Sequence, residues 1–289
     1  IDPLADISEL IRTRDGTPDP VRAIAMSVMP GPQLASAVPL ARQLKSRHPD
    51  VPMIWGGNFP SLYPTPVLLA PYVDWVIRGQ GERTIVELLH LLEHGGDPKA
   101  HSGLAFLDDG KPWIGPERAW VGPDELPAPP YDRIDVADYL RPSHLGSRSG
   151  VYQASIGCPY KCKFCGVISV FGSREQVESP ERIERNLAYL TRQFGMNGLH
   201  FYDNNFFVGE DRAVELAERI TPLGLSWWCE ARVDAMLRFS DSTWRHLAAS
   251  GLRMVFFGAE SGSDEVLEKM SKRLTTAEVV EDARRTQQH

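Results

Sequence analysis

The sequence predicts an α/β protein with two domains, a doubly wound parallel sheet followed by part of a barrel of alternating strands and helices. Apolar runs of strand length alternate with stretches whose apolar residues recur at helical spacing, and this alternation occurs twice along the 289 residues. A proline-rich stretch at 122–130 separates the two series. We therefore expect domains at 1–120 and 151–289, joined by a linker at 121–150.

In the first series, three apolar runs predict buried strands, at residues 21–28, 51–55 and 73–77. Helical spacing predicts the connecting helices, around 34–44 and 84–92, with a proline-broken helical stretch near 67–69. Two further short strands flank Asp109-Gly110, which is typical of a hairpin. Parallel strands that end in glycines and alternate with helices indicate a doubly wound sheet, here with a hairpin appended.

In the second series, four strands are expected, at residues 152–156, 199–202, 227–232 and 254–258. The helix after the first strand begins at Ser179-Pro180, a favourable N-cap followed by proline. Further helices are expected around 214–220 and 244–247. A capping box, Thr275 with Glu278, opens a last helix that no Gly or Pro closes, and the chain starts without methionine. We expect a chain truncated at both ends.

Composition excludes several classes of protein. Hydrophobic residues make up 42% and charged residues 24%, which is typical of a soluble globular chain. The net charge is −7 and no dense basic tract occurs, so no nucleic-acid partner is expected. No apolar stretch approaches the roughly 18 residues that a membrane span needs, and the first residues lack the features of a signal peptide. Four cysteines, three of them clustered, indicate metal binding in a reducing compartment, so we expect a cytoplasmic protein.

The three clustered cysteines, Cys158, Cys162 and Cys165, supply three thiolates without an obvious fourth ligand. Structural metal sites are normally closed by four protein ligands, so three indicate a site with an open position. Thiolates are soft ligands suited to iron–sulfur chemistry, and three of them can hold three irons of a [4Fe-4S] cluster. Polar residues also end the other strands of this series, as expected for a barrel whose chemistry lies at the carboxyl ends of its strands. They are Asp203-Asn204-Asn205, Glu230 with Arg232, and Glu260-Ser261.

The motif Cys158-x3-Cys162-x2-Cys165, with aromatic Phe164 before the last cysteine, resembles the signature of the radical S-adenosylmethionine (SAM) enzymes. The domain order resembles their cobalamin-binding branch, over nearly the whole chain. The resemblance implies a partial Rossmann-like B12-binding domain at 1–120. It also implies the first four units of a (β/α)6-type radical SAM partial barrel at 151–289. The expected cofactors are a [4Fe-4S] cluster, SAM and cobalamin.

The resemblance implies that SAM chelates the open iron and that reductive cleavage releases a 5'-deoxyadenosyl radical. It would place Phe164 against the SAM adenine, with a core aromatic as the alternative. It would place Asp203 at the SAM amino group, although the sequence here is not the Gly-Gly-Glu of many members; a helix cap is the alternative. Glu260 and Ser261 match a strand-end pair that approaches the SAM ribose or carboxylate. Arg232 would bind the SAM carboxylate, or form an inter-strand salt bridge.

In the first domain, a set of strand-end residues resembles the cobalamin-binding domain of that branch: Ser27, Gly56, Gly57, Gly79, Gly81 and Glu82. Glycines suit places where a bulky ligand approaches the backbone closely, and tight turns in a sheet that binds nothing are the alternative. The resemblance implies cobalamin bound without a histidine as lower ligand. No residue is expected to act as a catalytic acid or base.

The function expected is methylation of an unactivated carbon, with a radical cyclase or rearrangement enzyme as the alternative. Methylthiolation is disfavoured because the first domain carries no cysteine for a second cluster. A non-catalytic zinc module would need a fourth ligand such as His144, His200 or Cys229, none of which lies at zinc-finger spacing, and Cys229 is expected to be a buried apolar residue. A low-potential electron donor such as flavodoxin or ferredoxin is the expected partner. No pattern distinguishes a lipid, a peptide or a small metabolite as substrate.

Overall fold

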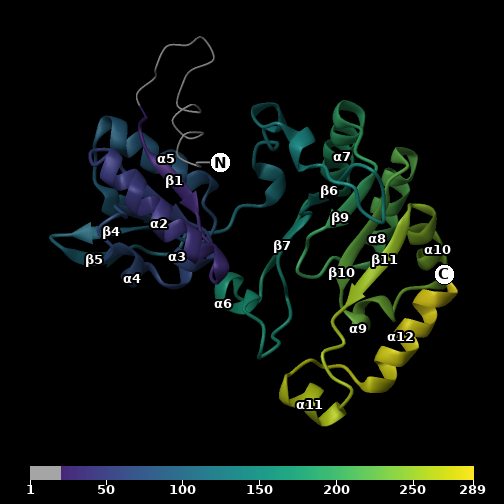
Figure 1. Ribbon diagram of the computed structural model, residues 1–289. Helices are drawn as coiled ribbons and strands as arrows, with labels where there is room; N and C mark the ends of the chain where they lie inside the picture. Colours follow the sequence, from purple (N-terminus) through teal and green to yellow (C-terminus); the bar gives the residue numbers. More distant parts are fainter. Residues whose placement is uncertain (1–20) are drawn as a thin grey trace. The chain divides into compact units, whose positions relative to one another are not determined.

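The computed structural model describes residues 21–289, which form two compact units, one reaching Val121 and one spanning Gly122–His289 (Figure 1). The first twenty residues of the expected 1–120 domain lie outside the described residues. Residues 122–150, expected as a linker, are part of the second unit, and Val136 and Leu140 from this segment are buried in its core.

The first unit is built on a five-stranded sheet with the strands in sequential order. Its strands are β1 (Ile24–Ser27), β2 (Met53–Gly56), β3 (Trp75–Ile77), β4 (Leu104–Asp108) and β5 (Lys111–Ile114). The first three are parallel, and β4 and β5 form an antiparallel hairpin paired with β3. The helices are α2 (Pro32–Arg47), α3 (Asn58–Leu62), α4 (Pro64–Leu68) and α5 (Glu82–His94), with a 3₁₀ turn η1 (Pro98–Ala100). The appended hairpin is thus present as expected.

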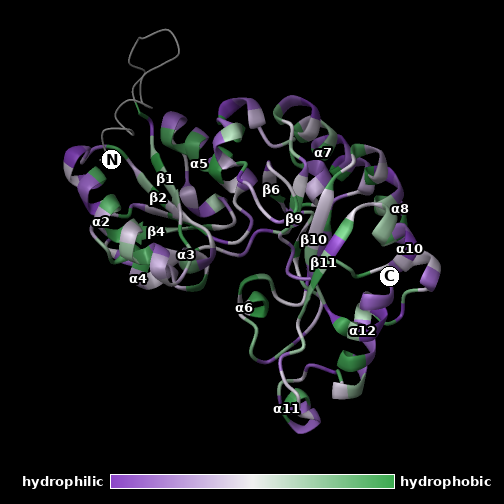
Figure 2. Ribbon diagram, turned by 45° about the vertical axis from the view of Figure 1, so that its right-hand side comes forward, coloured by the Kyte–Doolittle hydropathy of each residue, from purple (hydrophilic) through white to green (hydrophobic). Residues whose placement is uncertain are grey.

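The parallel strands of the first unit are short and apolar because both of their faces are covered. Trp55 and Val76 pack with Ala41 and Leu44 of α2 in one cluster, whereas Ile54 packs with residues of α5 in another. In Figure 2, α2 carries both hydrophobic and hydrophilic residues, as a helix with one face on a sheet requires.

The second unit contains a four-stranded sheet, ordered β11-β10-β9-β6, in which all neighbours are parallel. Its strands are β6 (Ser149–Tyr152), β9 (Gly198–Phe201), β10 (Ser226–Ala231) and β11 (Leu252–Phe257). The main helices are α7 (Pro180–Phe194), α8 (Glu210–Ile220) and α10 (Asp241–Ala249). Alternate residues of β10, Trp227, Cys229 and Ala231, are buried in the core. The expected strand and helix alternation of a partial barrel is therefore observed.

The strand expected at 152–156 is in fact two strands. After β6 the chain leaves the sheet, and β7 (Ser155–Gly157) pairs antiparallel with β8 (Glu175–Val177). The separation is fixed by hydrogen bonds, since the amide of Glu178 donates to the carbonyl of Ala154 over 2.8 Å. Gly157 has a φ of 87°, and a Cβ there would lie 2.1 Å from the carbonyl oxygen of Arg174, so only glycine fits. The strands β7 and β8 hold the cysteine loop between them.

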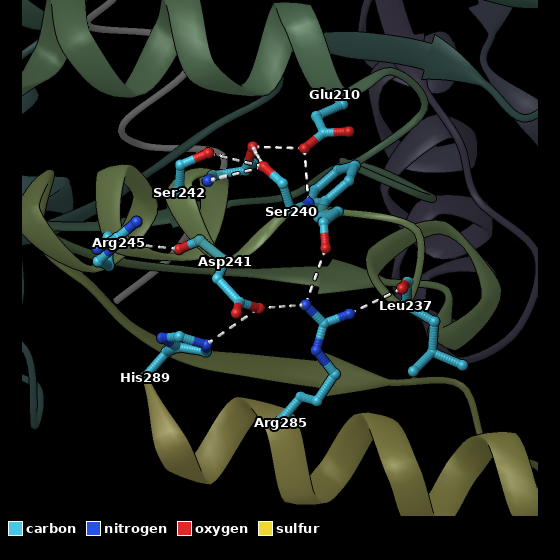
Figure 3. Close-up of polar contacts among 10 residues, drawn as sticks. Glu210, Leu237, Ser240, Asp241, Ser242, Arg245, Arg285 and His289 are labelled. Atoms are coloured by element: carbon cyan, nitrogen blue, oxygen red, sulfur yellow. Dashed lines mark hydrogen bonds and ion pairs between the residues drawn. The ribbon is translucent and has the colours of Figure 1, made fainter.

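Short elements complete the second unit. They are the helices α6 (Val167–Phe171), α9 (Val233–Met236), α11 (Asp264–Lys269) and α12 (Thr276–Gln288), and the 3₁₀ turns η2 (Pro123–Glu125), η3 (Tyr131–Arg133), η4 (Val136–Tyr139) and η5 (Thr221–Leu223). The capping box expected at Thr275 and Glu278 opens α12. Arg285 then attaches this helix to the segment before α10, donating to the carbonyls of Leu237 and Phe239, and to the first residue of α10, donating to the Asp241 carboxylate (Figure 3). Within residues 21–289, no helix is long and apolar enough to span a bilayer.

Candidate functional site

The loop after β7 carries the three clustered cysteines. Cys162 is buried, Cys158 and Cys165 are half-buried, and all three are free thiols. Backbone hydrogen bonds fix the loop at both ends and in the middle. The amide of Cys158 donates to the carbonyl of Arg174 (2.9 Å), Cys165 to Cys162 (3.1 Å), and Lys163 to Met270 (3.0 Å). The loop is therefore a defined structure that also contacts the segment after α11.

Residues that follow each strand of the parallel sheet converge on this loop. Asn204, after β9, donates weakly to the carbonyl of Gly157 (3.5 Å). Arg232, after β10, donates from Nη1 to the Sγ of Cys162 (3.3 Å). Lys272, in the segment after β11, accepts at its carbonyl a hydrogen bond from Arg232 Nη2 (2.7 Å). The carboxyl ends of the strands thus meet at the cysteines, as expected for a barrel-type site.

Arg232 is only 5% exposed. Besides Cys162 and Lys272, its Nε donates to the carboxylate of Asp234 (2.8 Å), and its guanidinium lies 3.8 Å from the centre of the Tyr160 ring. Its salt bridge is local, to Asp234 two residues later, and does not join two strands. The role expected at the SAM carboxylate stays a prediction. Tyr160, Asp234 and Lys272 are the residues that sequence reasoning missed here.

Asp203 is 3% exposed, and both of its carboxylate oxygens are occupied by the chain itself. One accepts from the hydroxyl of Ser155 (2.5 Å), the other from the amide of Ala154 (3.2 Å). Burial raises the pKa of Asp203 to about 6. Asp203 therefore fastens the start of β7 to the end of β9, and it does not cap a helix. Asn205 accepts at its Oδ1 from the amide of Arg232 (3.1 Å), so it supports the end of β10.

Glu260 and Phe164 both lie near the Lys272 ammonium. Lys272 Nζ donates to Glu260 Oε1 (2.7 Å) and lies 5.7 Å from the centre of the Phe164 ring. Phe164 is 48% exposed, which excludes the core aromatic considered from the sequence. Its ring is free to contact a ligand. Ser261 is half-buried and accepts from the amide of Ser263 (3.1 Å), so it shapes the turn after β11.

Cys229 and His200 were considered above as a fourth ligand of a zinc module. Cys229 is fully buried within the core, as expected for a small apolar residue, and burial raises the pKa of its thiol well above the ordinary value. Both carboxylate oxygens of Glu230 lie 3.0 Å from His200 Nε2, and the His200 ring stacks on Trp228, with ring centres 3.7 Å apart. Glu230 of β10 is thus paired with a histidine of the neighbouring strand β9.

The cysteine loop carries the type of ligand that an iron–sulfur cluster takes. Cys158, Cys162 and Cys165 are free thiols on one loop, and two of them are half-buried. Thiolates are soft ligands suited to iron–sulfur chemistry, and three of them can hold three irons of a [4Fe-4S] cluster. Within residues 21–289, no three His, Cys, Asp or Glu side chains form a ready-made site for one metal ion. The donor set therefore agrees with the cluster.

The first unit brings its strand ends together through Ser61, a residue that sequence reasoning missed. The Ser61 hydroxyl donates to the carbonyl of Gly57 (2.7 Å) and accepts from the amide of Gly79 (2.9 Å). Gly57 has a φ of 90°, and a Cβ there would lie 2.9 Å from the hydroxyl of Ser27. Gly56 lies beside it at the end of β2. These loops form one edge of the sheet.

The remaining expected residues lie at the start of α5. Gly81 is its N-cap and Glu82 its first residue, where a carboxylate is favoured by the helix dipole. A Cβ on Gly81 would lie 3.3 Å from Ile77, whereas Gly79 has open space around it and a φ of 69°. Gly57 and Gly79 are therefore required by the backbone, and Gly79 leaves room for a ligand.

The two units correspond to two known families. Residues 5–89 match the B12-binding domain, and residues 152–288 match the radical SAM superfamily. A domain of each kind, in this order, defines the cobalamin-binding branch of radical SAM proteins. This chain belongs to that family.

Relatives of known sequence agree with the assignment. An uncharacterized methyltransferase of Pyrococcus horikoshii is 31% identical over 96% of this chain and 59% of its own length. The hopanoid C-3 methylase of Methylococcus capsulatus is 29% identical over 82% of the chain and 45% of its own length. The anaerobic magnesium-protoporphyrin IX monomethyl ester cyclase of Synechocystis is 27% identical over 85% of the chain and 49% of its own length. The chain thus spans about half of each relative.

Solved structures share the fold at low sequence identity. The radical SAM methyltransferase TsrM from Kitasatospora setae, solved with tryptophan and a SAM analogue, has a TM-score of 0.75 at 19% identity; the match covers 99% of this chain and 57% of TsrM. The cobalamin-dependent radical enzyme OxsB, solved with aqua-cobalamin and SAM, has a TM-score of 0.73 at 18% identity, covering 97% and 40%. Both units of this chain therefore have the fold of known cobalamin-dependent radical SAM enzymes.

Proposed function

We propose that the chain carries the cofactor sites of a cobalamin-dependent radical SAM methyltransferase that methylates an unactivated carbon. The observation that carries the proposal is the loop of three free thiols on which the residues after β9, β10 and β11 converge. The proposed cofactors are a [4Fe-4S] cluster, SAM and cobalamin. A B12-binding domain and methyltransferases among the relatives support this choice.

The protein's part is to bind and orient these cofactors. When bound, the cluster supplies the electron for reductive cleavage of SAM, and cobalamin supplies the methyl group. Cys158, Cys162 and Cys165 would hold three irons. Phe164, exposed beside them, offers an aromatic face to the SAM adenine.

Other residues would act at the edges of these sites. Glu260 is a suitable acceptor for the ribose hydroxyls of SAM, because a carboxylate accepts hydrogen bonds from hydroxyls, and Lys272 holds it in place. In the first unit, Ser27 and the loops at Gly57 and Gly79 form the proposed edge that contacts cobalamin. Asp203 supports the cysteine loop through Ser155 and Ala154, and we assign it no ligand.

A radical cyclase is the second candidate function. The magnesium-protoporphyrin cyclase of Synechocystis aligns over 257 residues of this chain, so the same domain pair occurs in a protein with a different reaction. A cyclase or rearrangement enzyme would use the same cysteines and would not transfer the SAM methyl group to the product. A low-potential electron donor such as flavodoxin or ferredoxin is part of the proposal in both cases.

The experiment that separates these functions follows an isotopic label. The chain is reconstituted anaerobically with iron, sulfide and hydroxocobalamin and incubated with methyl-labelled SAM, a reductant and cell extract. Mass spectrometry then records 5'-deoxyadenosine and any product that gains a labelled methyl group. We expect the wild type to form 5'-deoxyadenosine and a labelled product. Cys229→Ala, a matched control outside the loop, should form the same two compounds, and Cys162→Ala should form neither of them. A product that forms without the label favours the cyclase, and SAM that stays intact contradicts both functions.

A further inference from the structure

The guanidinium of Arg232 joins three segments that are distant in the sequence. Its own position follows β10, and its contacts reach Cys162, 70 residues earlier, and Lys272, 40 residues later. A second contact links the same two segments, from the amide of Lys163 to the carbonyl of Met270 (3.0 Å). Arg232 is therefore placed to fix the cysteine loop against the rest of the unit.

The chemistry of this position requires arginine. Three of the five N–H groups of a guanidinium are used in three directions, toward a carboxylate, a thiol and a carbonyl. The planar face also stacks on the ring of Tyr160 at 3.8 Å. A lysine has one flexible ammonium and no flat face, so it could keep the charge but not this set of contacts. Asp234 balances the charge of the buried guanidinium and fixes its orientation.

The contact with Cys162 has a consequence for the cluster of the proposed function. Hydrogen bonds to the sulfurs of an iron–sulfur cluster, and the charge near it, help to set its reduction potential. Reduction adds negative charge to the cluster. A donor with a positive charge at the Cys162 sulfur therefore stabilises the reduced form more than the oxidised form and raises the potential.

We propose that Arg232 is a positioning residue of the cluster site, which fixes the cysteine loop and raises the reduction potential of the cluster through its hydrogen bond to Cys162. This inference rests on the proposed function. It assigns Arg232 a role at a cysteine sulfur, which differs from the role at the SAM carboxylate that the sequence suggested. It also gives Tyr160, which lies between two of the cysteines, a function in holding the loop.

The first test needs no cluster. Hydrogen–deuterium exchange at the Lys163 amide reports whether the loop stays closed, because that amide donates to Met270 across the junction. We expect Arg232→Gln and Tyr160→Leu each to speed this exchange about tenfold or more, since each removes the cation–ring contact. Arg219→Gln is the matched control; it removes an arginine that pairs with Glu181, Glu184 and Glu215 on the helix surface. Unchanged exchange in Tyr160→Leu and Arg232→Gln overturns the positioning role.

The second test measures the potential of the reconstituted protein by a reductive titration followed by electron paramagnetic resonance. We expect the midpoint of Arg232→Gln to be lower than that of wild type by about 59 mV or more, a tenfold change in the reduction equilibrium. Arg232→Lys should lie between them, because it keeps the charge without the fixed hydrogen bond. If Arg232→Gln does not fold, the difference in midpoint potential between Arg232→Lys and wild type tests the proposal in its place. Equal potentials in the folded variants overturn the proposal, whereas a wild type that forms no cluster overturns the proposed function instead.

Discussion

At the scale of single residues, Gly57 is a position of the first unit where the backbone tolerates little change. It combines a φ of 90° with close approach to Ser27 and Val28, whose atoms would lie 2.9–3.0 Å from an added Cβ. Its neighbour Gly56 lies in β2 with nothing nearer than 3.8 Å. The backbone therefore requires glycine at position 57 and leaves room for a side chain at position 56.

We expect Gly57→Ala to destabilise the protein by about 1–3 kcal/mol, because alanine is strained in this backbone conformation and the new methyl group displaces Ser27. Gly56→Ala is the matched control and should change stability by no more than about 0.5 kcal/mol. Urea denaturation followed by circular dichroism measures both. Equal stabilities of the two variants would show that Gly57 is not constrained in this way.

Some residues of the site could be predicted from the sequence and others could not. The three cysteines could be predicted because their motif is local, within eight residues of one loop. The partners of Arg232 could not be predicted, because Cys162 and Lys272 are 70 and 40 residues away and no spacing rule links them. Asp203 was found as a strand-end carboxylate, but its contacts with Ser155 and Ala154 depend on the break between β6 and β7.

At the scale of elements, α12 combines a defined attachment with a buried acid. Arg285 bonds to the segment at 237–241 (Figure 3). One turn earlier, Asp282 is fully buried, and neither of its carboxyl oxygens has a hydrogen-bond partner among the described residues. Burial raises the pKa of Asp282 to about 7, although Arg285 opposes the shift, and Asp234 of α9 adds to it.

The raised pKa predicts a pH dependence of stability. The folded protein holds the Asp282 proton up to about pH 7, whereas an unfolded aspartate loses it near pH 3.9. The contribution of Asp282 to the free energy of unfolding is therefore fully present below about pH 4 and is lost as the pH rises through 7. We expect Asp282→Asn to be more stable than wild type at pH 8, by about 1–3 kcal/mol, with little difference at pH 4. Urea denaturation at both values measures this, with exposed Glu281→Gln as control; parallel pH profiles for Asp282→Asn and wild type would contradict it.

Among the elements, those with strong periodicity were predictable and those held by distant contacts were not. The apolar positions of α7 and its Ser179 cap predicted that helix, and it is present at Pro180–Phe194. The pair β7 and β8 was missed because each strand has three residues and carries no alternation; their pairing depends on Gly157 and Arg174. The helices α9 and α11, of four and six residues, are too short for a periodic signal.

At the scale of the whole molecule, the chain is divided into a B12-binding domain and a radical SAM domain. The division was predictable because the strand and helix alternation restarts after the proline-rich stretch. The exact domain boundary could not be predicted, because residues 122–150 have the composition of a linker. They nevertheless contribute Val136 and Leu140 to the core of the second unit. In the second domain, the three clustered cysteines are proposed to hold a [4Fe-4S] cluster.

Iron and acid-labile sulfide content after anaerobic reconstitution tests this claim most directly. We expect about four of each per chain in the wild type and in Cys229→Ala, and none in the variant with Cys158, Cys162 and Cys165 all replaced by alanine. Cobalamin binding, measured on the same samples, should persist in that variant because the first domain is unaltered. Tightly bound zinc without sulfide in the wild type, or unchanged iron and sulfide in the triple variant, would contradict the account.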